Sequence, residues 1–266
     1  MKLTNITKDF KDVRAVDNLS IEIDKGQIIG FIGSNGAGKS TTINMIMESI
    51  YPSNGDITGN TDISYVTSEP SFYDNLYVKD IIKYECKLCN KINDNIDYLI
   101  EYFDLNINKK IKELSLGNKK KLALVCSFIK DSNIYILDEP TSGLDPIMQE
   151  KLFNYLLKLK NDNKCIFLSS HNLIEVEKYC DKVLIIKNGV LVKTVDLDKV
   201  KSKNIVICTY ELKDGSTNKI IWKKSIKSLL NKLNSLDIIK LEIKNESVID
   251  EFLGYYNMEE NIWKKY

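Results

Sequence analysis

Short, continuous runs of apolar residues mark the first 200 positions of the chain and predict buried strands. Ile28–Ile32, Ile134–Leu137 and Cys165–Ser169 are runs of this kind, and strands that are covered on both faces read as unbroken apolar segments. Between the last two runs, apolar residues recur at helical spacing over Ile147–Leu159. This strand-helix-strand rhythm favours an α/β fold with a parallel sheet.

Other stretches of the chain have different periods. Leu19, Ile21 and Ile23 alternate with polar residues, which predicts a small antiparallel sheet near the start. Ile63–Val66 reads as a further short strand. From about Leu76 to Ile129 the apolar spacing is close to 3.6 residues, so we expect a mostly helical insert there.

Near residue 200 the pattern becomes that of a separate small unit. Asn204–Leu212 and Ile238–Ile243 read as strands, and the segment between them carries one apolar helix face. We therefore expect one domain at residues 1–200, with its helical part at about 76–130. A small C-terminal accessory domain of α+β type is expected at 201–266.

The balance of charges limits the partners of the chain. Among 266 residues, 38 are Lys or Arg and 37 are Asp or Glu, which leaves a net charge of +1. No global field then attracts nucleic acid, and no nucleic-acid partner is predicted. The longest apolar stretch, Leu122–Ile129, is far too short to span a membrane, so a cytoplasmic protein is expected.

The cysteines predict no metal centre and no disulfide framework. Cys86 and Cys89 form a C-x-x-C pair, but no second pair and no His stands at zinc spacing. The six cysteines are scattered, and we interpret them as reduced thiols.

A glycine-rich loop follows the first apolar run. Its sequence, GSNGAGKS, fits the pattern G-x-x-x-x-G-K-[ST] and leads into a helix-like stretch, Thr41–Ile50. Backbone N–H groups of such a loop point into one concavity, at the positive end of the helix that follows, and bind phosphate oxygens. The loop therefore predicts a nucleoside triphosphate site, in which Lys39 reaches the β- and γ-phosphates and Ser40 holds Mg²⁺. The residues of this site are Gly33, Ser34, Asn35, Gly36, Ala37, Gly38, Lys39, Ser40 and Thr41.

Two carboxylates follow the apolar run Ile134–Leu137. Because adjacent side chains at a strand end point in different directions, Asp138 can hold Mg²⁺ while Glu139 faces the attacking water and acts as base. His171, the single histidine, follows the run Cys165–Ser169. It could orient water or sense the γ-phosphate; taken alone, an ordinary core or surface histidine is an equal alternative.

Taken in order, these motifs resemble the nucleotide-binding subunit of ATP-binding-cassette (ABC) transporters over roughly residues 1–200. GSNGAGKST is similar to Walker A, ILDEP at Ile136–Pro140 to Walker B, SGLD at Ser142–Asp145 to the D-loop, and His171 to the switch histidine. LSLGN at Leu114–Asn118 occupies the place of the family signature LSGGQ. Phe10 resembles the aromatic residue that stacks on adenine, and an ordinary core Phe is the alternative.

The resemblance implies a P-loop NTPase fold of the ABC cassette type, with a mixed sheet core, an antiparallel β subdomain and a helical subdomain, followed by the C-terminal appendage. It also implies a Mg²⁺-dependent ATPase with Lys39, Glu139 and His171 as catalytic residues. In the family, the signature helix closes over the γ-phosphate held by the opposite subunit. Ser115, Gly117 and Asp145 are therefore expected to serve the ATP of a second copy or of a sister cassette.

A multi-span membrane permease is the partner that the resemblance implies, which places the chain at the inner face of the cell membrane. The residues where the family receives the permease's coupling helix are aromatic or apolar here: Phe72, Tyr73, Leu76 and Tyr77. Such side chains suit an interface, and internal packing of the helical subdomain is the alternative. The SLG sequence resembles the branch with ABC-2-type permeases and favours export; the transported substrate and the choice between homodimer and heterodimer stay open.

The chain departs from the family pattern at two places. The family's Gln before the helical subdomain falls on Ser68, which is too short to reach Mg²⁺ and water; either Glu69 replaces it or the contact is lost. In the signature, Leu116 replaces the first glycine and Asn118 replaces the glutamine. Slow hydrolysis is compatible with these changes.

Two competing functions remain at this point. One is a soluble ABC-type ATPase that acts on ribosomes or DNA, but such proteins usually carry two cassettes or a coiled coil, which the sequence does not show. The other is a nucleotide-regulated binding or immunity module with vestigial hydrolysis.

Overall fold

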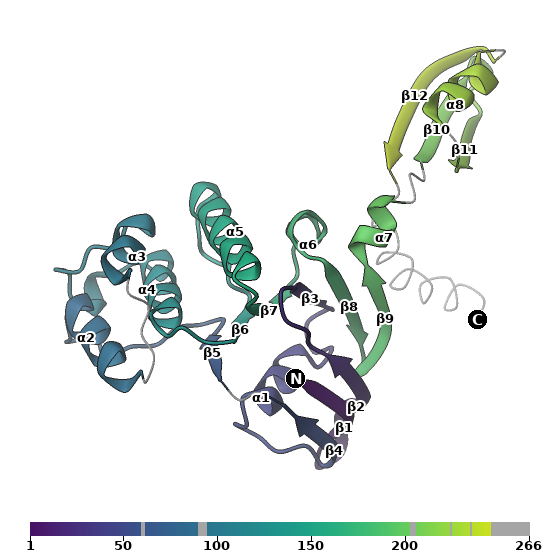
Figure 1. The fold of residues 1–266 in the computed structure, drawn as a ribbon. Coiled ribbons are helices and arrows are strands. Elements are labelled where there is room, and N and C mark those ends of the chain that lie inside the picture. The colour runs from purple at the N-terminus through teal and green to yellow at the C-terminus, as the bar shows by residue number, and fades with distance from the viewer. Residues whose placement is uncertain (60–61, 90–94, 203–205, 224, 235, 246–266) are drawn as a thin grey trace. The chain divides into compact units, whose positions relative to one another are not determined.

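Six strands form the central sheet of the chain, in the order β5-β6-β7-β3-β8-β9, in a computed structural model (Figure 1). The structure describes residues 1–266 except 60–61, 90–94, 203–205, 224, 235 and 246–266. Within this sheet, the neighbouring strands β5, β6, β7, β3 and β8 are paired in parallel, as the apolar runs predict. Their bounds are β3 (Ile28–Ile32), β5 (Ile63–Val66), β6 (Ile134–Asp138), β7 (Cys165–Ser170), β8 (Lys182–Lys187) and β9 (Val190–Asp196).

Helices cover the central sheet and bury its inner strands. Every residue of β3, β6 and β7 is buried, which explains why these strands read as unbroken apolar runs. Helix α1 packs against β6, while α5 and α6 pack against β3. These helices are α1 (Lys39–Ile46), α5 (Pro146–Asn161) and α6 (Leu173–Tyr179).

A second, antiparallel sheet shares its core with the first. Its order is β2-β1-β4, with β1 (Lys2–Phe10), β2 (Val13–Glu22) and β4 (Asn54–Thr58). Leu3, Ile6 and Leu19 belong to the same buried cluster as Phe31 and Phe167 of the central sheet. This core holds the antiparallel sheet against the strand that leads into the glycine-rich loop.

The helical insert contains α2 (Val78–Leu88), α3 (Ile96–Tyr102), a 3₁₀ turn (Ile111–Glu113) and α4 (Leu116–Ile129). An aromatic cluster joins it to the central sheet. The ring centroid of Phe128 on α4 lies 4.6 Å from that of Tyr155 on α5 and 5.8 Å from those of Phe103 and Tyr135. Rings at these distances gain about 0.5–1.5 kcal/mol per pair beyond their burial.

Two local turns show how single residues set element ends. β8 and β9 are joined by Asn188-Gly189, whose φ angles of 49° and 80° are those of a type I′ hairpin turn. Helix α1 ends at Ile46 rather than continuing to Ile50, because Glu48 adopts a left-handed φ of 55° and closes the helix end.

The chain divides into two compact units, Met1–Thr194 and Val195–Tyr266. The second contains α7 (Leu197–Ser202), β10 (Val206–Leu212), β11 (Thr217–Trp222), α8 (Ile226–Leu233) and β12 (Ile238–Asn245). Its antiparallel sheet has the order β11-β10-β12, and Leu229 and Leu233 of α8 pack on β10 in a separate core. The expected strand start at Asn204 lies outside the described residues.

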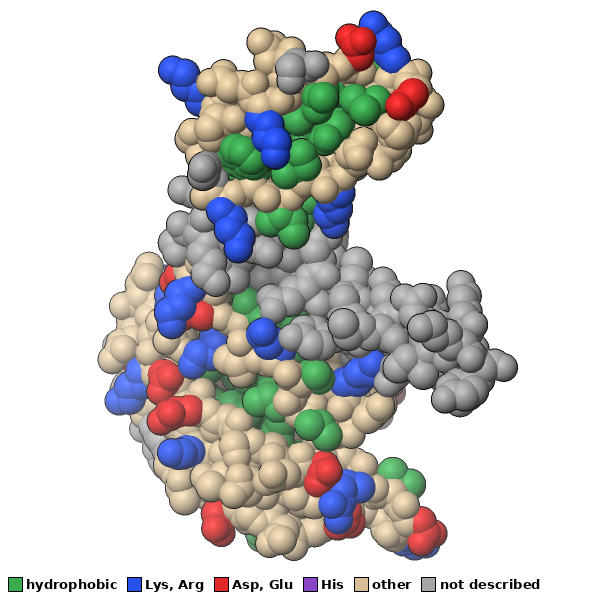
Figure 2. Space-filling view, turned by 90° about the vertical axis from the view of Figure 1, so that its right-hand side faces the viewer, with side chains coloured by type: hydrophobic (Ala, Val, Ile, Leu, Met, Phe, Trp, Pro, Cys, Tyr) green, Lys and Arg blue, Asp and Glu red, His purple; other side chains and the backbone are tan. Residues whose placement is uncertain are grey.

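Apolar side chains also lie on the surface of the second unit. Leu230, Leu236 and Ile239 are each more than a third exposed, and Figure 2 shows apolar side chains gathered on one face of this unit. In the described part of the whole chain, no helix has the length and apolar character needed to cross a membrane.

The aromatic cluster predicts a large effect of Phe128→Ala on stability. The side chain is fully buried and touches rings from three other segments, so its removal leaves a cavity between the helical insert and the sheet. We expect the free energy of unfolding to fall by about 3–5 kcal/mol, measured by urea denaturation. The control is Tyr98→Ala, whose ring is 45% exposed and whose loss should cost less than about 1 kcal/mol. Equal losses at the two positions would contradict the proposed link.

Candidate nucleotide site

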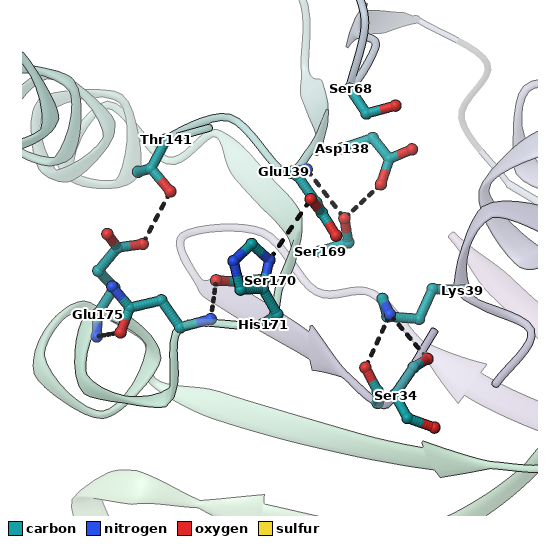
Figure 3. Close-up of polar contacts among 12 residues, drawn as sticks. Ser34, Lys39, Ser68, Asp138, Glu139, Thr141, Ser169, Ser170, His171 and Glu175 are labelled. Carbon is teal, nitrogen blue, oxygen red and sulfur yellow. Dashed lines mark hydrogen bonds and ion pairs between the residues drawn. The ribbon is translucent and has the colours of Figure 1, made fainter. Parts of the chain in front are cut away.

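Parallel pairing of β7 with both β3 and β6 brings three loops to one edge of the sheet. Ile32 of β3 is in register with Ser170, and Asp138 of β6 is in register with Ser169. The chain leaves all three strands at this edge, so the loop after β3, the carboxylates after β6 and His171 after β7 lie near one another (Figure 3).

The glycine-rich loop is fixed at its ends and open in its middle. A Cβ on Gly33 would lie 2.5 Å from the carbonyl oxygen of Ile186, and a Cβ on Gly38, whose φ is 106°, would lie 2.6 Å from that of Ala15. Gly36, with φ of 79°, has no atom within 4 Å of its Cβ position. Only glycine fits the two ends, because any side chain would collide with backbone.

The first turn of α1 opens into this loop. No side chain caps the helix N-terminus, so its N–H groups and the positive end of the helix dipole are presented to the loop. Ser34, Asn35 and Ser40 are exposed, whereas Ala37 is buried; Thr41 is partly buried. An uncapped helix start beneath an open glycine loop fits the phosphates of a nucleotide.

Lys39 provides the positive charge of the loop. Its Nζ donates to the carbonyl oxygens of Gly33 at 2.8 Å and Ser34 at 3.1 Å, so the ammonium lies inside the loop (Figure 3). Burial lowers the pKa of Lys39, while Glu139 and Asp138 oppose that change by raising it. A cation held by neutral carbonyls, with the carboxylates nearby, suits a polyanionic phosphate chain.

Ser169 organises the two carboxylates. Its hydroxyl donates a short hydrogen bond to Asp138 and accepts one of 3.0 Å from the backbone N–H of Glu139. Asp138 is 5% exposed, so this hydroxyl helps to stabilise a nearly buried carboxylate. Asp138 and Ser40 offer hard oxygen ligands of the kind that Mg²⁺ takes in nucleotide sites.

Glu139 turns out of the strand. Its φ of 44° is left-handed, a conformation that costs a non-glycine residue roughly 1–2 kcal/mol, and the bond to Ser169 helps to hold it. The Glu139 carboxylate lies 3.4 Å from Nδ1 of His171. His171 is mostly exposed, with 68% of its side chain accessible, which rules out the core histidine and leaves both groups accessible to a bound ligand.

The signature helix begins beside the loop that follows Glu139. Ser115 caps α4 by accepting from the N–H of Asn118 at 3.3 Å. A Cβ at Gly117 would lie 2.6 Å from the carbonyl oxygen of Gly143, so the helix start and this loop are packed backbone to backbone. Leu116 is instead 59% exposed, which explains why a large side chain is tolerated at the departure from the family glycine.

The remaining two predicted residues lie at the surface. Asp145 caps α5, accepting from the N–H of Met148 at 2.9 Å, so its carboxylate has a structural partner in its own chain. Phe10 is 46% exposed at the end of β1, and Nζ of Lys8 lies 5.1 Å from its ring centroid. The alternative of a core phenylalanine is therefore wrong, and the ring is accessible for stacking.

One buried lysine on α4 was not predicted from the sequence. Lys120 is 1% exposed, and its Nζ donates to the carbonyl oxygens of Thr67 at 3.0 Å and Ser68 at 2.8 Å. Ser68 is the position where the family's Gln is expected. A lysine in a run of three lysines reads as surface, so only the fold reveals its direction.

The fold and this edge of the sheet define a nucleoside triphosphatase with a phosphate-binding loop. The family model described as ABC transporter matches residues 16–142. An uncharacterized ABC transporter ATP-binding protein of Methanocaldococcus jannaschii is 34% identical, over 95% of this chain and 98% of the relative. The bacitracin transport ATP-binding protein of Bacillus licheniformis is 30% identical, over 95% and 96%.

The chain therefore belongs to the ABC transporter ATP-binding proteins, and it is an ATPase subunit of a membrane transporter. A solved ATP-binding subunit of an ABC transporter has a TM-score of 0.71 at 26% identity, over 76% of this chain and 91% of that chain. A dimeric ABC cassette with a TM-score of 0.66, 22% identical over 74% and 98% of the two chains, has the same fold. The predicted cassette fold is confirmed.

Ser169→Ala should slow ATP hydrolysis while the chain stays folded. The substitution leaves Asp138 without its hydroxyl donor and the N–H of Glu139 without its acceptor. We expect the turnover rate to fall about 10- to 100-fold, the usual effect of removing a partner that orients a site residue, measured by phosphate release at saturating ATP.

The matched control is Ser64→Ala on β5. Ser64 is equally buried, and its hydroxyl bonds to that of Ser132 at 2.8 Å. It contacts none of the site residues, so its rate should stay within about twofold of wild type. An unchanged rate in Ser169→Ala would show that the hydroxyl does not organise the carboxylates.

Proposed function

We propose that the chain binds MgATP in the loop at Gly33–Ser40 and hydrolyses it to power a separate membrane permease that exports its substrate. The observation that carries the proposal is the meeting of Lys39, Asp138, Glu139 and His171 at one edge of the sheet. These groups are a phosphate-binding cation, a metal ligand, a base and a polar partner for that base, which are the parts that phosphoryl transfer to water requires.

The phosphates would lie over the first turn of α1. Its N–H groups and Lys39 would bind the phosphate oxygens, and Phe10 would stack on the adenine. Ser40 and Asp138 would hold Mg²⁺, which when bound neutralises charge on the β- and γ-phosphates. The Ser169 hydroxyl keeps one carboxylate oxygen of Asp138 engaged and thereby orients the other.

Glu139 would take the proton of the attacking water. Its left-handed backbone directs the carboxylate toward His171, whose imidazole can hold that carboxylate or the γ-phosphate in place. Both side chains are accessible from solvent, so water can reach the base before the site closes.

A second copy, or a sister cassette, would complete the site. Ser115 and the Gly117 backbone lie at a helix N-terminus that packs on the loop containing Gly143, and Asp145 ends the same loop. An anion at this helix start would be favoured by the helix dipole. In a head-to-tail dimer that anion is the γ-phosphate held by the other subunit, so ATP binding closes the pair and hydrolysis reopens it.

The permease would dock on the helical insert. A groove of about 860 Å³ there is lined by Ser71, Phe72, Tyr73, Leu76, Asp80, Ile81, Tyr84 and Glu85. Tyr73 is 81% exposed, so internal packing does not account for it. Tyr77 is not among the lining residues; its ring is in contact with Lys79 and Lys110.

The charges of the groove indicate what kind of helix enters it. Glu85 is partly buried, and burial raises the pKa of its carboxyl group; no Lys or Arg of the described residues pairs with it within 4 Å. A docked segment with aromatic or aliphatic anchors and one Lys or Arg would fit both the apolar wall and this carboxylate. Docking would hold the chain at the inner face of the membrane.

The relatives support transport rather than the competing functions. One is named for bacitracin transport and matches nearly the whole chain, which favours export. The net charge of +1 offers no general attraction to ribosomes or DNA. The retained Lys39, Glu139 and His171 argue against vestigial hydrolysis.

Glu139→Gln tests the ATPase mechanism. The amide keeps the shape of the side chain but cannot accept the proton, so the hydrolysis rate should fall on the order of 10²–10⁴-fold. The variant should also accumulate as an ATP-bound dimer, detected by size-exclusion chromatography with light scattering.

Glu175→Gln is the matched control. Glu175 lies on α6 and accepts from the Thr141 hydroxyl at 3.0 Å, a bond that glutamine can keep. Its rate should stay within about threefold of wild type. If the wild-type chain neither hydrolyses MgATP nor dimerises with it, the proposed function is wrong.

Glu85→Lys tests the docking groove. Reversing this charge should repel the incoming cation, so the tagged chain expressed in its own host should no longer cosediment with membranes. Its ATPase rate in solution should change less than about twofold, because Glu85 is outside the nucleotide site.

Glu101→Lys makes the same charge change on α3, at an exposed position outside the groove, and should leave membrane recovery unchanged. The protein recovered with wild type should be a multi-span membrane protein, identified by mass spectrometry. Recovery of ribosomes or DNA in its place would favour the soluble class of ABC ATPases.

A further inference from the structure

Lys120 differs from its two neighbouring lysines on α4 because its ammonium is held by backbone carbonyls and not by an exposed carboxylate. Lys119 lies 3.6 Å from Asp74 and Lys121 lies 3.5 Å from Asp104, and both of these carboxylates are well exposed. Lys120 makes no ion pair within 4 Å with any residue that the structure describes; its two hydrogen bonds go to the backbone of Thr67 and Ser68. A buried ammonium is costly unless its surroundings compensate the charge.

The compensating charges belong to the nucleotide site. Asp138 and Glu139, at the end of β6, and Glu69, just after the two bonded carbonyls, all raise the pKa of Lys120 by their negative charge. Burial outweighs them and lowers that pKa to about 8. The ammonium therefore lies within electrostatic reach of both carboxylates to which the proposed function gives a chemical role.

The segment that Lys120 holds is the one where this chain departs from its family. A Gln is expected at position 68, and Ser68 has too short a side chain to reach a metal or a water. In Figure 3, Ser68 lies on the side of the site where Asp138 is drawn. Lys120 reaches this place from the helical insert, whereas the expected Gln would reach it from the segment itself.

We propose that Lys120 is a positioning residue for ATP hydrolysis, which ties α4 to the Thr67–Ser68 backbone and, in place of the missing Gln, puts a positive charge within electrostatic reach of Asp138 and Glu139. This rests on the roles proposed above for the two carboxylates. The same helix begins at Ser115 and packs on Gly143. Movement of α4 when a second subunit closes is thus transmitted directly to the segment next to the carboxylates.

Lys120→Met tests the proposal, because it keeps the length and apolar stem but removes the charge and the donors. We expect kcat for ATP to fall about 10- to 100-fold, as for other groups that orient site residues. The KM for ATP should change less than about threefold, since the phosphate loop is untouched. Lys121→Met is the matched control: Lys121 is also buried, next in sequence and bonded to Asp104, and its kcat should stay within about twofold.

Adding Ser68→Gln to Lys120→Met separates a positioning role from a merely structural one. If Lys120 stands in for the missing amide, the double variant should recover at least about threefold in kcat over Lys120→Met. Ser68→Gln alone should have little effect, because Lys120 already fills the role. Lys120→Gln, which keeps donors for the two carbonyls without the charge, should lie between wild type and Lys120→Met, and it decides the matter if Lys120→Met fails to fold.

The proposal is overturned if kcat is unchanged in a folded Lys120 variant, if KM rises in place of the fall in kcat, or if Ser68→Gln gives no recovery. The wild-type rate and that of Glu139→Gln are measured in parallel. No wild-type hydrolysis would refute the proposed function, whereas normal hydrolysis with an unaffected Lys120 variant refutes this inference alone.

Discussion

The parallel pairing of β7 between β3 and β6 is the constraint on which the site depends. It places Ser169 opposite Asp138 and Ser170 opposite Ile32, so that the phosphate loop, the two carboxylates and His171 leave the sheet at a common edge. A slip by one residue would turn every side chain of a strand to the other face. Because every residue of β3, β6 and β7 is buried, such a slip would force side chains on both faces of the sheet to repack, and in this way the core fixes the chemistry.

Much of the fold and site could be predicted because the same residues carry both. The run Ile28–Ile32 coincides with β3, since a strand buried on both faces has no polar positions to blur its ends. Ile63–Val66 coincides with β5, an edge strand in which buried and partly buried residues alternate. Residues that follow such strands share an edge by topology alone, which is why Lys39, Glu139 and His171 could be grouped from the order of their motifs along the chain.

The features that escaped prediction depend on contacts between distant segments. From the sequence, Lys120 is expected at the surface; only the packing of α4 near Thr67 shows that its ammonium is buried. Ser169 looks like an ordinary strand end in the sequence; only the pairing of β7 with β6 shows that its hydroxyl binds Asp138. Tyr77 belongs to an aromatic stretch, but it is not among the residues that line the groove, and its ring is in contact with Lys79 and Lys110 instead.

The close contact between Gly117 and Gly143 gives two neighbouring positions of the signature motif different tolerance for side chains. Leu116 projects into solvent, so this site is open to side chains of very different size and charge. One residue later, a single methyl group would meet backbone, which no change of rotamer can relieve. A larger side chain therefore fits within the chain at position 116 and does not fit at position 117, so the packing of this helix start does not require the first glycine of the family motif.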